Sequence, residues 1–128
     1  EGRTNHLKLY GEIDVALDPL PYGGATTTCE AIGMGVPVIS MAGKGMVGRL
    51  SASILKHSGH ESWIARDKHH YVEIAKLLAD EGIREASKRL KLRQEVFSSD
   101  LCKGERLSRE LERIYREARA ISKKARSK

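Results

Sequence analysis

Three short apolar runs lie in the first half of the chain, at residues 14–20, 36–41 and 62–65. Continuous rather than alternating runs of this length are typical of strands that are covered on both faces. Helix-length segments at 26–34 and 47–57 separate the runs. This order predicts a β-α-β-α-β unit over residues 1–65, with parallel strands and right-handed crossovers.

The second half has a different pattern, because its apolar residues recur at helical spacing. Residues 71–79 and 83–97 each carry an apolar stripe, and Gly82 lies in the break between them. The clearest stripe, in 105–121, consists of Leu107, Leu111, Ile114, Tyr115, Ala118 and Ile121. Residues 66–128 are therefore predicted to be helical and to pack on or beside the sheet.

Three parallel strands followed by helices indicate an α/β fold that is part of a Rossmann-like domain. A complete nucleotide-binding domain of this class usually has five or six strands. The chain also begins with Glu1 rather than with a methionine. We therefore expect a fragment, with further strands upstream.

The composition is that of a globular domain, with 40% apolar and 31% charged residues in 128. No apolar run approaches the roughly 20 residues of a membrane span, and no signal-peptide pattern opens the chain, so no membrane partner is expected. Cys29 and Cys102 lie far apart in sequence, which suits a reducing cytoplasm. The histidines lack the spacing of a zinc site, and no metal is expected.

The net charge of +6 is unevenly distributed along the chain. Residues 1–64 hold five basic and six acidic residues, whereas residues 65–128 hold 18 and 11. A basic half can attract nucleic acid, but Lys/Arg-rich helices commonly present solvated faces. One Phe and four Tyr also offer little surface for stacking on bases. The sequence therefore argues against a nucleic-acid partner.

Candidate chemistry concentrates in residues 18–37, where a strand ends, a Pro/Gly loop turns and a helix begins with the threonines 26–28. A helix N-terminus offers free N–H groups to phosphate. Gly23 and Gly24 allow the backbone to come close to a ligand. Glu30, about one turn later, has the reach to accept hydrogen bonds from a ribose diol. Together these features fit a nucleoside diphosphate.

The same residues also fit an alternative that needs no ligand. Thr27 and Glu30 have the spacing of a capping box with Thr27 as the N-cap. The loop lacks the lysine of a Walker motif and a full GxGxxG pattern. Asp14 and Asp18 flank the first strand on one face, and they are more simply turn or cap residues than an acid–base pair.

Several motifs resemble the C-terminal catalytic region of the O-linked N-acetylglucosamine transferases, most of all the bacterial and plant relatives that carry tetratricopeptide repeats. The longest is YGEIDVALDPLPYGGATTTCEAIGMGVPVISMAG. It is followed in order by GRLSASIL, YVEIAKLLAD and ERLSRELERIY, so that the resemblance covers most of residues 6–117. That family has a GT-B fold, in which two Rossmann-like domains face each other across a cleft and the second one binds the UDP-sugar donor.

The resemblance implies an inverting glycosyltransferase that moves N-acetylglucosamine from UDP-GlcNAc to Ser or Thr hydroxyls of proteins, without an essential metal or other cofactor. The chain would be the second part of the donor-binding domain. Its implied partners are the donor, the protein acceptor and a missing N-terminal catalytic domain. The family's lysine that neutralises the leaving diphosphate lies upstream, so no catalytic residue is expected here, and the isolated fragment is expected to be inactive.

The resemblance also points to donor-binding residues. Thr26 and Thr27 match a threonine pair at the diphosphate, and Gly24 lies in the loop before them. Glu30 matches an acidic position, usually Asp, that holds the ribose. His6 matches a histidine that lies against the uracil, although by itself it would be an unremarkable residue of an N-terminal tail.

Four other positions qualify this assignment. Ala25 stands where some relatives have a histidine, which removes one donor to the phosphate. Arg49 matches a basic position and is expected only to support the loop. Trp63 is expected in the core of the third strand. Cys29 lacks a partner histidine, so a nucleophilic role is not expected.

A different class of function stays open as the alternative. The chain would then be a non-catalytic protein-interaction domain with a degenerate nucleotide site. Its basic helices at 83–97 and 105–121 would hold a protein partner or an acidic surface.

Overall fold

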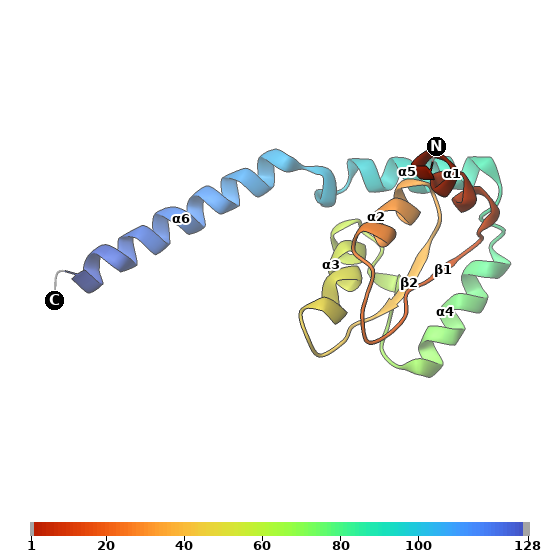
Figure 1. Cartoon of the computed structure of the whole chain (residues 1–128), viewed down its shortest axis with the longest axis horizontal. Coiled ribbons are helices and arrows are strands. Elements are labelled where there is room, and N and C mark those ends of the chain that lie inside the picture. Colours follow the sequence, from red (N-terminus) through yellow and green to blue (C-terminus); the bar gives the residue numbers. More distant parts are fainter. Residues whose placement is uncertain (1, 127–128) are drawn as a thin grey trace.

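A parallel three-stranded sheet forms the centre of the molecule in a computed structural model, which describes residues 2–126 (Figure 1). The strands are β1 (Ala16–Leu17), β2 (Val38–Met41) and β3 (Ile64–Ala65). The helices are α1 (Gly2–Leu9), α2 (Thr26–Gly33), α3 (Leu50–His57), α4 (Lys68–Asp80), α5 (Ala86–Ser98) and α6 (Gly104–Arg126). Short 3₁₀ turns lie at Tyr10–Glu12, Val47–Arg49, Glu61–Trp63 and Asp100–Cys102.

The strand order is β1-β2-β3, with β2 in the middle. Ala16 pairs with Val38, and Ser40 pairs with Ile64. Each connection between paired strands contains a helix, as parallel strands require. The predicted α/β fold with three parallel strands is confirmed.

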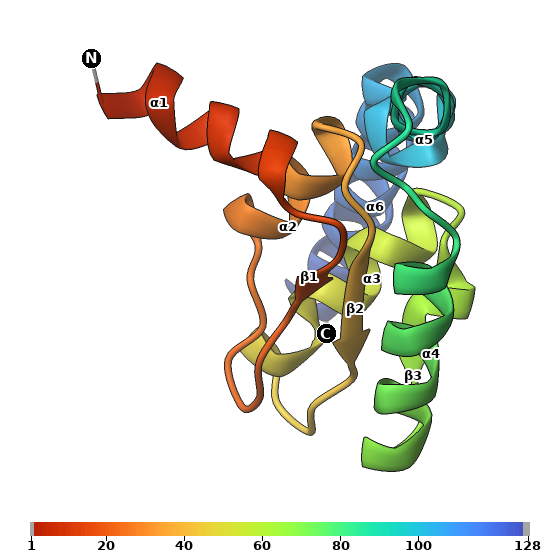
Figure 2. The ribbon, with the colours of Figure 1, turned by 90° about the vertical axis from the view of Figure 1, so that its right-hand side faces the viewer.

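Helices cover both faces of the sheet, which explains the continuous apolar runs (Figures 1 and 2). Val38 of β2 belongs to a core cluster with residues of α2, α3 and α5, among them Ile32 and Leu55. The next residue, Ile39, belongs to a second cluster with Ile74 and others of α4. Adjacent strand residues therefore point into two different cores.

The N-terminal segment is a helix and not the tail expected from the sequence. After α1 the chain makes a 3₁₀ turn in which Tyr10 is buried. The Arg89 guanidinium of α5 holds this turn, donating to the carbonyl oxygens of Tyr10 at 2.7 Å and Ile13 at 2.6 Å. Thus α5 fastens the segment that carries His6.

Two local predictions are wrong. Helix α2 begins at Thr26 with Ala25 as its N-cap and without a side-chain cap bond, so Thr27 is not the N-cap of a capping box. Trp63 lies in the 3₁₀ turn before β3 and not inside a strand. Its ring is stacked on that of His60, with 4.2 Å between the centroids. This stacking explains how the turn accommodates so large a side chain.

Helix α6 extends away from the body (Figure 1), and its side chains from 104 to 124 are exposed. The expectation that the late helices all pack on or beside the sheet is therefore wrong for α6. Charged pairs along the helix include those of Arg113 with Glu110 and Glu117. The apolar stripe, including Ile114, is left open to solvent. None of the helices in residues 2–126 has the length and hydropathy to cross a bilayer.

Candidate functional site

A buried carboxylate organises the loop that joins β1 to α2. Asp18 is 8% exposed. Its Oδ1 accepts a hydrogen bond from the Gly24 N–H at 2.6 Å, and its Oδ2 accepts one from the Ser40 hydroxyl at 2.7 Å. The Tyr71 hydroxyl of α4 donates to the Asp18 carbonyl oxygen at 3.0 Å. The loop is thereby tied to β2 and α4 at the carboxyl edge of the sheet.

The carbonyl group of Gly24 is held in place as well as its N–H group. Its carbonyl oxygen accepts hydrogen bonds from the hydroxyls of Thr28, at 2.8 Å, and Ser51. A Cβ at position 24 would lie 2.2 Å from the Thr27 Oγ1. Both polar groups of Gly24 are thus engaged within the protein. What this residue offers a ligand is close backbone approach and not a free N–H group.

The first turn of α2 presents unpaired donors beside this loop. First-turn N–H groups have no acceptor inside a helix, and Ala25 supplies no side-chain acceptor. Thr26 and Thr27 are exposed, whereas Thr28 is buried with its hydroxyl turned inward. Two of the three threonines can therefore present both an N–H and a hydroxyl to an anion.

His6, Tyr10 and Glu30 form a cluster between α1 and α2. The Nε2 of His6 lies 3.2 Å from the Oε2 of Glu30. The rings of His6 and Tyr10 meet edge to face, with 5.5 Å between their centroids. The Tyr10 hydroxyl donates to the same Oε2 at 3.5 Å. Burial, and then the Glu30 charge, raise the pKa of Tyr10. The structure thus brings together two residues that the sequence treated separately.

Sequence reasoning missed Tyr10. Its position four residues after His6 would place both on one face of a helix, and this spacing is the only available signal. Tyr10 also lines a hollow of about 320 Å³ together with Gly23, Gly24 and Thr27. It therefore connects the Glu30 cluster with the Gly/Thr loop.

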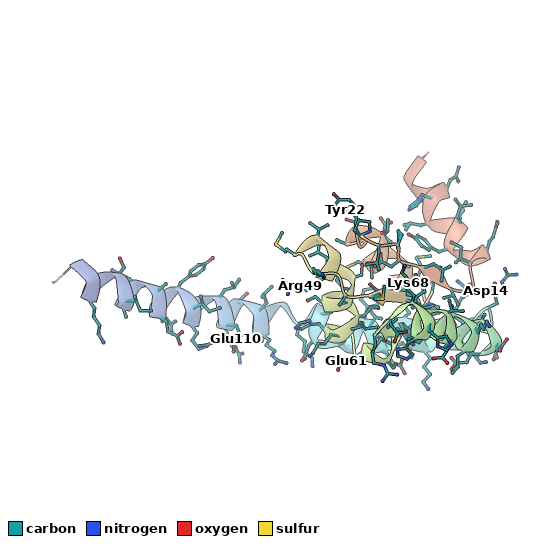
Figure 3. All side chains as sticks on the ribbon, turned by 90° about the horizontal axis from the view of Figure 1, so that it is seen from below. Asp14, Tyr22, Arg49, Glu61, Lys68 and Glu110 are labelled. Carbon is teal, nitrogen blue, oxygen red and sulfur yellow. The ribbon has the colours of Figure 1, made fainter. Side chains whose placement is uncertain are left out.

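Three cations lie in segments that follow the carboxyl ends of the strands, and Figure 3 labels two of them, Arg49 and Lys68. Lys44 lies in the loop after β2, Arg49 precedes α3, and Lys68 begins α4. None of the three forms an ion pair with a residue of the described part of the chain, unlike Arg113 and Arg116 of α6. Unpaired positive charges at the edge of the sheet where α2 begins create a local potential that attracts anions.

Arg49 was expected to support the loop before α2. In the structure, backbone contacts of the neighbouring residues hold the segment that contains Arg49. The Gly43 N–H donates to the Gly48 carbonyl oxygen at 2.7 Å. A Cβ on Gly48 would lie 3.0 Å from the Pro21 carbonyl oxygen, so the two loops are in close contact. The exposed Arg49 side chain is free to meet a ligand.

Asp14 takes no part in this site. It lies at the other end of β1, where its Oδ1 forms an ion pair with Arg84 at 2.6 Å.

Burial, and then nearby negative charge, raise the pKa of the Cys29 thiol, which disfavours a thiolate nucleophile. Within residues 2–126, His, Cys, Asp and Glu side chains form no group of three that could hold a metal ion.

The family model for glycosyl transferase family 41 matches residues 2–111. The chain belongs to this family. It is 39% identical over 112 residues to the probable UDP-N-acetylglucosamine–peptide N-acetylglucosaminyltransferase SPINDLY of Solanum lycopersicum, and 34% identical to the protein of that name from Arabidopsis thaliana. These matches cover 88% of the chain and 12% of each relative.

Part of a solved structure has a similar fold. A mutant O-GlcNAc transferase from Thermobaculum terrenum superposes with a TM-score of 0.77 and 38% identity, covering 91% of this chain and 22% of that one. The predicted resemblance and the Rossmann-like, GT-B-type fold are confirmed. The chain spans about an eighth of the length of the curated relatives that it matches.

Proposed function

We propose that the chain is the donor-binding part of a family 41 transferase that moves N-acetylglucosamine from UDP-GlcNAc to Ser or Thr hydroxyls of proteins. The observation that carries the proposal is the first turn of α2. Its unpaired N–H groups and the exposed hydroxyls of Thr26 and Thr27 lie at the carboxyl edge of a parallel sheet, where such folds bind ligands. The names of the similar proteins indicate UDP-N-acetylglucosamine as the donor and a peptide as the acceptor.

In this role the helix start binds the diphosphate of the donor. The acceptor oxygen attacks the anomeric carbon from the face opposite to the UDP. As the bond from that carbon to the phosphate oxygen breaks, UDP takes the electron pair. Thr26 and Thr27 stabilise the negative charge that develops, and Lys44, Arg49 and Lys68 add a favourable potential.

The nucleoside end of the donor would lie toward α1. The Glu30 carboxylate accepts hydrogen bonds from the ribose diol, and His6 lies against the uracil. The contact between these two residues supports this placement, because it brings a diol acceptor and an aromatic ring together at one end of α2. In this proposal no metal is needed to hold the phosphates, because the N–H groups and hydroxyls of Thr26 and Thr27 would donate hydrogen bonds to them.

We assign no residue of the described range 2–126 as the base that accepts the proton of the acceptor hydroxyl. The remaining catalytic groups would come from an N-terminal catalytic domain outside the 128 residues, in keeping with the greater length of the relatives. Tetratricopeptide repeats for holding the protein acceptor would belong to that longer protein. A cytoplasmic location suits the two exposed free thiols, Cys29 and Cys102.

Nucleotide titration of the ¹⁵N-labelled chain tests the proposal. UDP should shift amide signals clustered in residues 23–30, and uridine should bind more weakly because it lacks the diphosphate. GDP at the same concentrations reports whether the site prefers uracil. The double variant Thr26→Ala/Thr27→Ala should lose the advantage of UDP over uridine, whereas Ser53→Ala, which removes an exposed hydroxyl of α3, should keep it. Saturating UDP without shifts in 23–30 would reject the proposal.

A further inference from the structure

The carboxylate of Asp18 lies where its charge opposes the proposed ligand. It is buried beside the loop that leads into α2, and no described cation forms an ion pair with it. A buried carboxylate is costly unless hydrogen bonds satisfy it, and a negative charge near a diphosphate weakens binding by Coulomb repulsion. A carboxylate at this position is therefore explained only if it also has an effect that favours the binding of the ligand.

The hydrogen bonds of Asp18 show what this role is. One carboxylate oxygen takes the Ser40 hydroxyl, which anchors it to the central strand, and the other takes the Gly24 N–H. Glycine has many accessible backbone conformations, and Gly24 directly precedes the helix cap. The carboxylate selects one of these conformations by accepting from the N–H group.

The carbonyl group of the same residue completes the restraint, so that both peptide groups that meet at the Gly24 Cα are held. With its N–H held by Asp18, the Gly24 carbonyl oxygen points to the buried hydroxyls of Thr28 and Ser51. The chain then enters α2 at Thr26 with the first-turn N–H groups of the helix facing outward. If the peptide group between Gly24 and Ala25 rotated, the Gly24 carbonyl oxygen would be free to face the anion instead.

We propose that Asp18 is a positioning residue of the anion site. It acts through the backbone of Gly24 to keep the N–H groups and hydroxyls of Thr26 and Thr27 directed at the diphosphate. This inference rests on the proposed function. It assigns to a negatively charged residue a favourable effect on the binding of a negatively charged ligand.

The direction in which one substitution changes the affinity for UDP distinguishes a positioning role from simple charge repulsion. Asp18→Asn removes the charge while keeping the size of the side chain. If the charge alone mattered, UDP would bind this variant more tightly. If Asp18 positions the loop, UDP should bind several-fold more weakly, because a neutral amide oxygen accepts the Gly24 N–H less strongly than a carboxylate oxygen does. Uridine, which lacks the diphosphate, should keep its affinity.

The matched control is Asp14→Asn, which makes the same change at the other end of β1, where Asp14 is exposed and paired with Arg84. Calorimetric titration of each variant with UDP and with uridine gives the ratio of the two affinities. Only Asp18→Asn should lower this ratio. An unchanged or increased ratio in Asp18→Asn would overturn the inference, while failure of the unmodified chain to bind UDP would reject the proposed function instead.

Two further measurements apply even if Asp18→Asn does not fold. Ser40→Ala removes one donor to Asp18 without changing any charge, and it should lower the same ratio by a smaller factor. Hydrogen exchange of the Gly24 amide in the unmodified chain needs no nucleotide. This amide should exchange much more slowly than that of Gly45 in the exposed loop after β2. Equal exchange rates would show that Asp18 does not hold Gly24 and would overturn the inference.

Discussion

The backbone of Gly35 lies directly against that of Arg89, so that a Cβ on Gly35 would be 2.5 Å from the Arg89 carbonyl oxygen. Gly35 also has a φ of +77°, which residues with a side chain rarely adopt. This contact joins the turn after α2 to the first turns of α5. The same Arg89 holds Tyr10 and Ile13 with its guanidinium, so the contact fixes the helix that fastens the N-terminal segment.

Gly35→Ala should therefore destabilise the fold. The added methyl group meets backbone atoms that cannot rotate away, and the left-handed conformation adds strain, so we expect a loss of about 2 kcal/mol or more in unfolding free energy. Urea denaturation measures the loss. Gly33→Ala is the control, because a Cβ there meets nothing within 4 Å. Equal stability of the two variants would contradict the close contact.

Glu30→Ala should weaken UDP binding without much loss of stability. Glu30 lies five positions after the Ala25 N-cap and has no capping role, and its partner His6 is half exposed. We expect about a tenfold loss of UDP affinity and less than about 1 kcal/mol of unfolding free energy. Titration calorimetry and thermal denaturation give the two values. Glu61→Ala, at an exposed pair with Lys56, should change neither.

The reverse result has a clear meaning for Glu30. Unchanged UDP affinity together with a stability loss of about 0.5–2 kcal/mol would indicate a capping residue, and it would exclude the ribose role.

Acidic conditions should destabilise the fold through His60. Burial lowers the pKa of His60, with the nearby charge of Glu95 acting in the opposite direction; Ser58 and Trp63 are its other close neighbours. The unfolded imidazole titrates at about pH 6.5. As the pH falls below this value, the unfolded chain binds a proton that the folded chain does not. The unfolding free energy therefore decreases as the pH falls toward the pKa of His60 in the folded state.

Urea denaturation at pH 7.5 and 5.5 measures this effect. His60→Gln should reduce the pH dependence, whereas His69→Gln, at an exposed site, should preserve it. The fluorescence of Trp63, the single tryptophan, reports protonation of the stacked imidazole in the folded state. A fluorescence midpoint above pH 6.5 would contradict the lowered pKa.

The apolar stripe of α6 should contribute little to the stability of this chain. Ile114 is 48% exposed, whereas Leu92 of α5 is 5% exposed within the core. Leu92→Ala should cost about 2–5 kcal/mol, and Ile114→Ala should stay within about 0.5 kcal/mol. Chemical denaturation of the two variants makes the comparison. A large loss in Ile114→Ala would show that α6 packs on the body.

The sheet was predictable because apolar runs at 14–20, 36–41 and 62–65 reflect burial on both faces. Helix α1 was not, because its sequence is mostly polar. Its position depends instead on contacts from distant residues, such as Arg89. The failure to anticipate where α6 lies has a related cause. A stripe such as that of Ile114 indicates that a helix has an apolar face but not what covers it.

The candidate site was predictable in composition but not in its internal connections. The Gly/Thr loop was visible in the sequence, yet Thr27 was placed at the wrong helix position. The helix begins two residues earlier, after the Ala25 N-cap, because Gly24 is fixed by Asp18, six positions away, and by Ser51, on another helix. Likewise, the role of Asp18 depends on Ser40, which the sequence gives no reason to connect with it.

The middle position of β2 has a consequence for the order of folding. Each of its pairings joins residues roughly 20 positions apart, so neither can form before a crossover segment has closed a long loop. The two sides of β2 also belong to different apolar clusters. Collapse of either cluster alone leaves this strand half covered. We therefore expect the pairings of β2 to be complete only once both clusters have formed, whereas α1 and α6 can detach while the sheet persists.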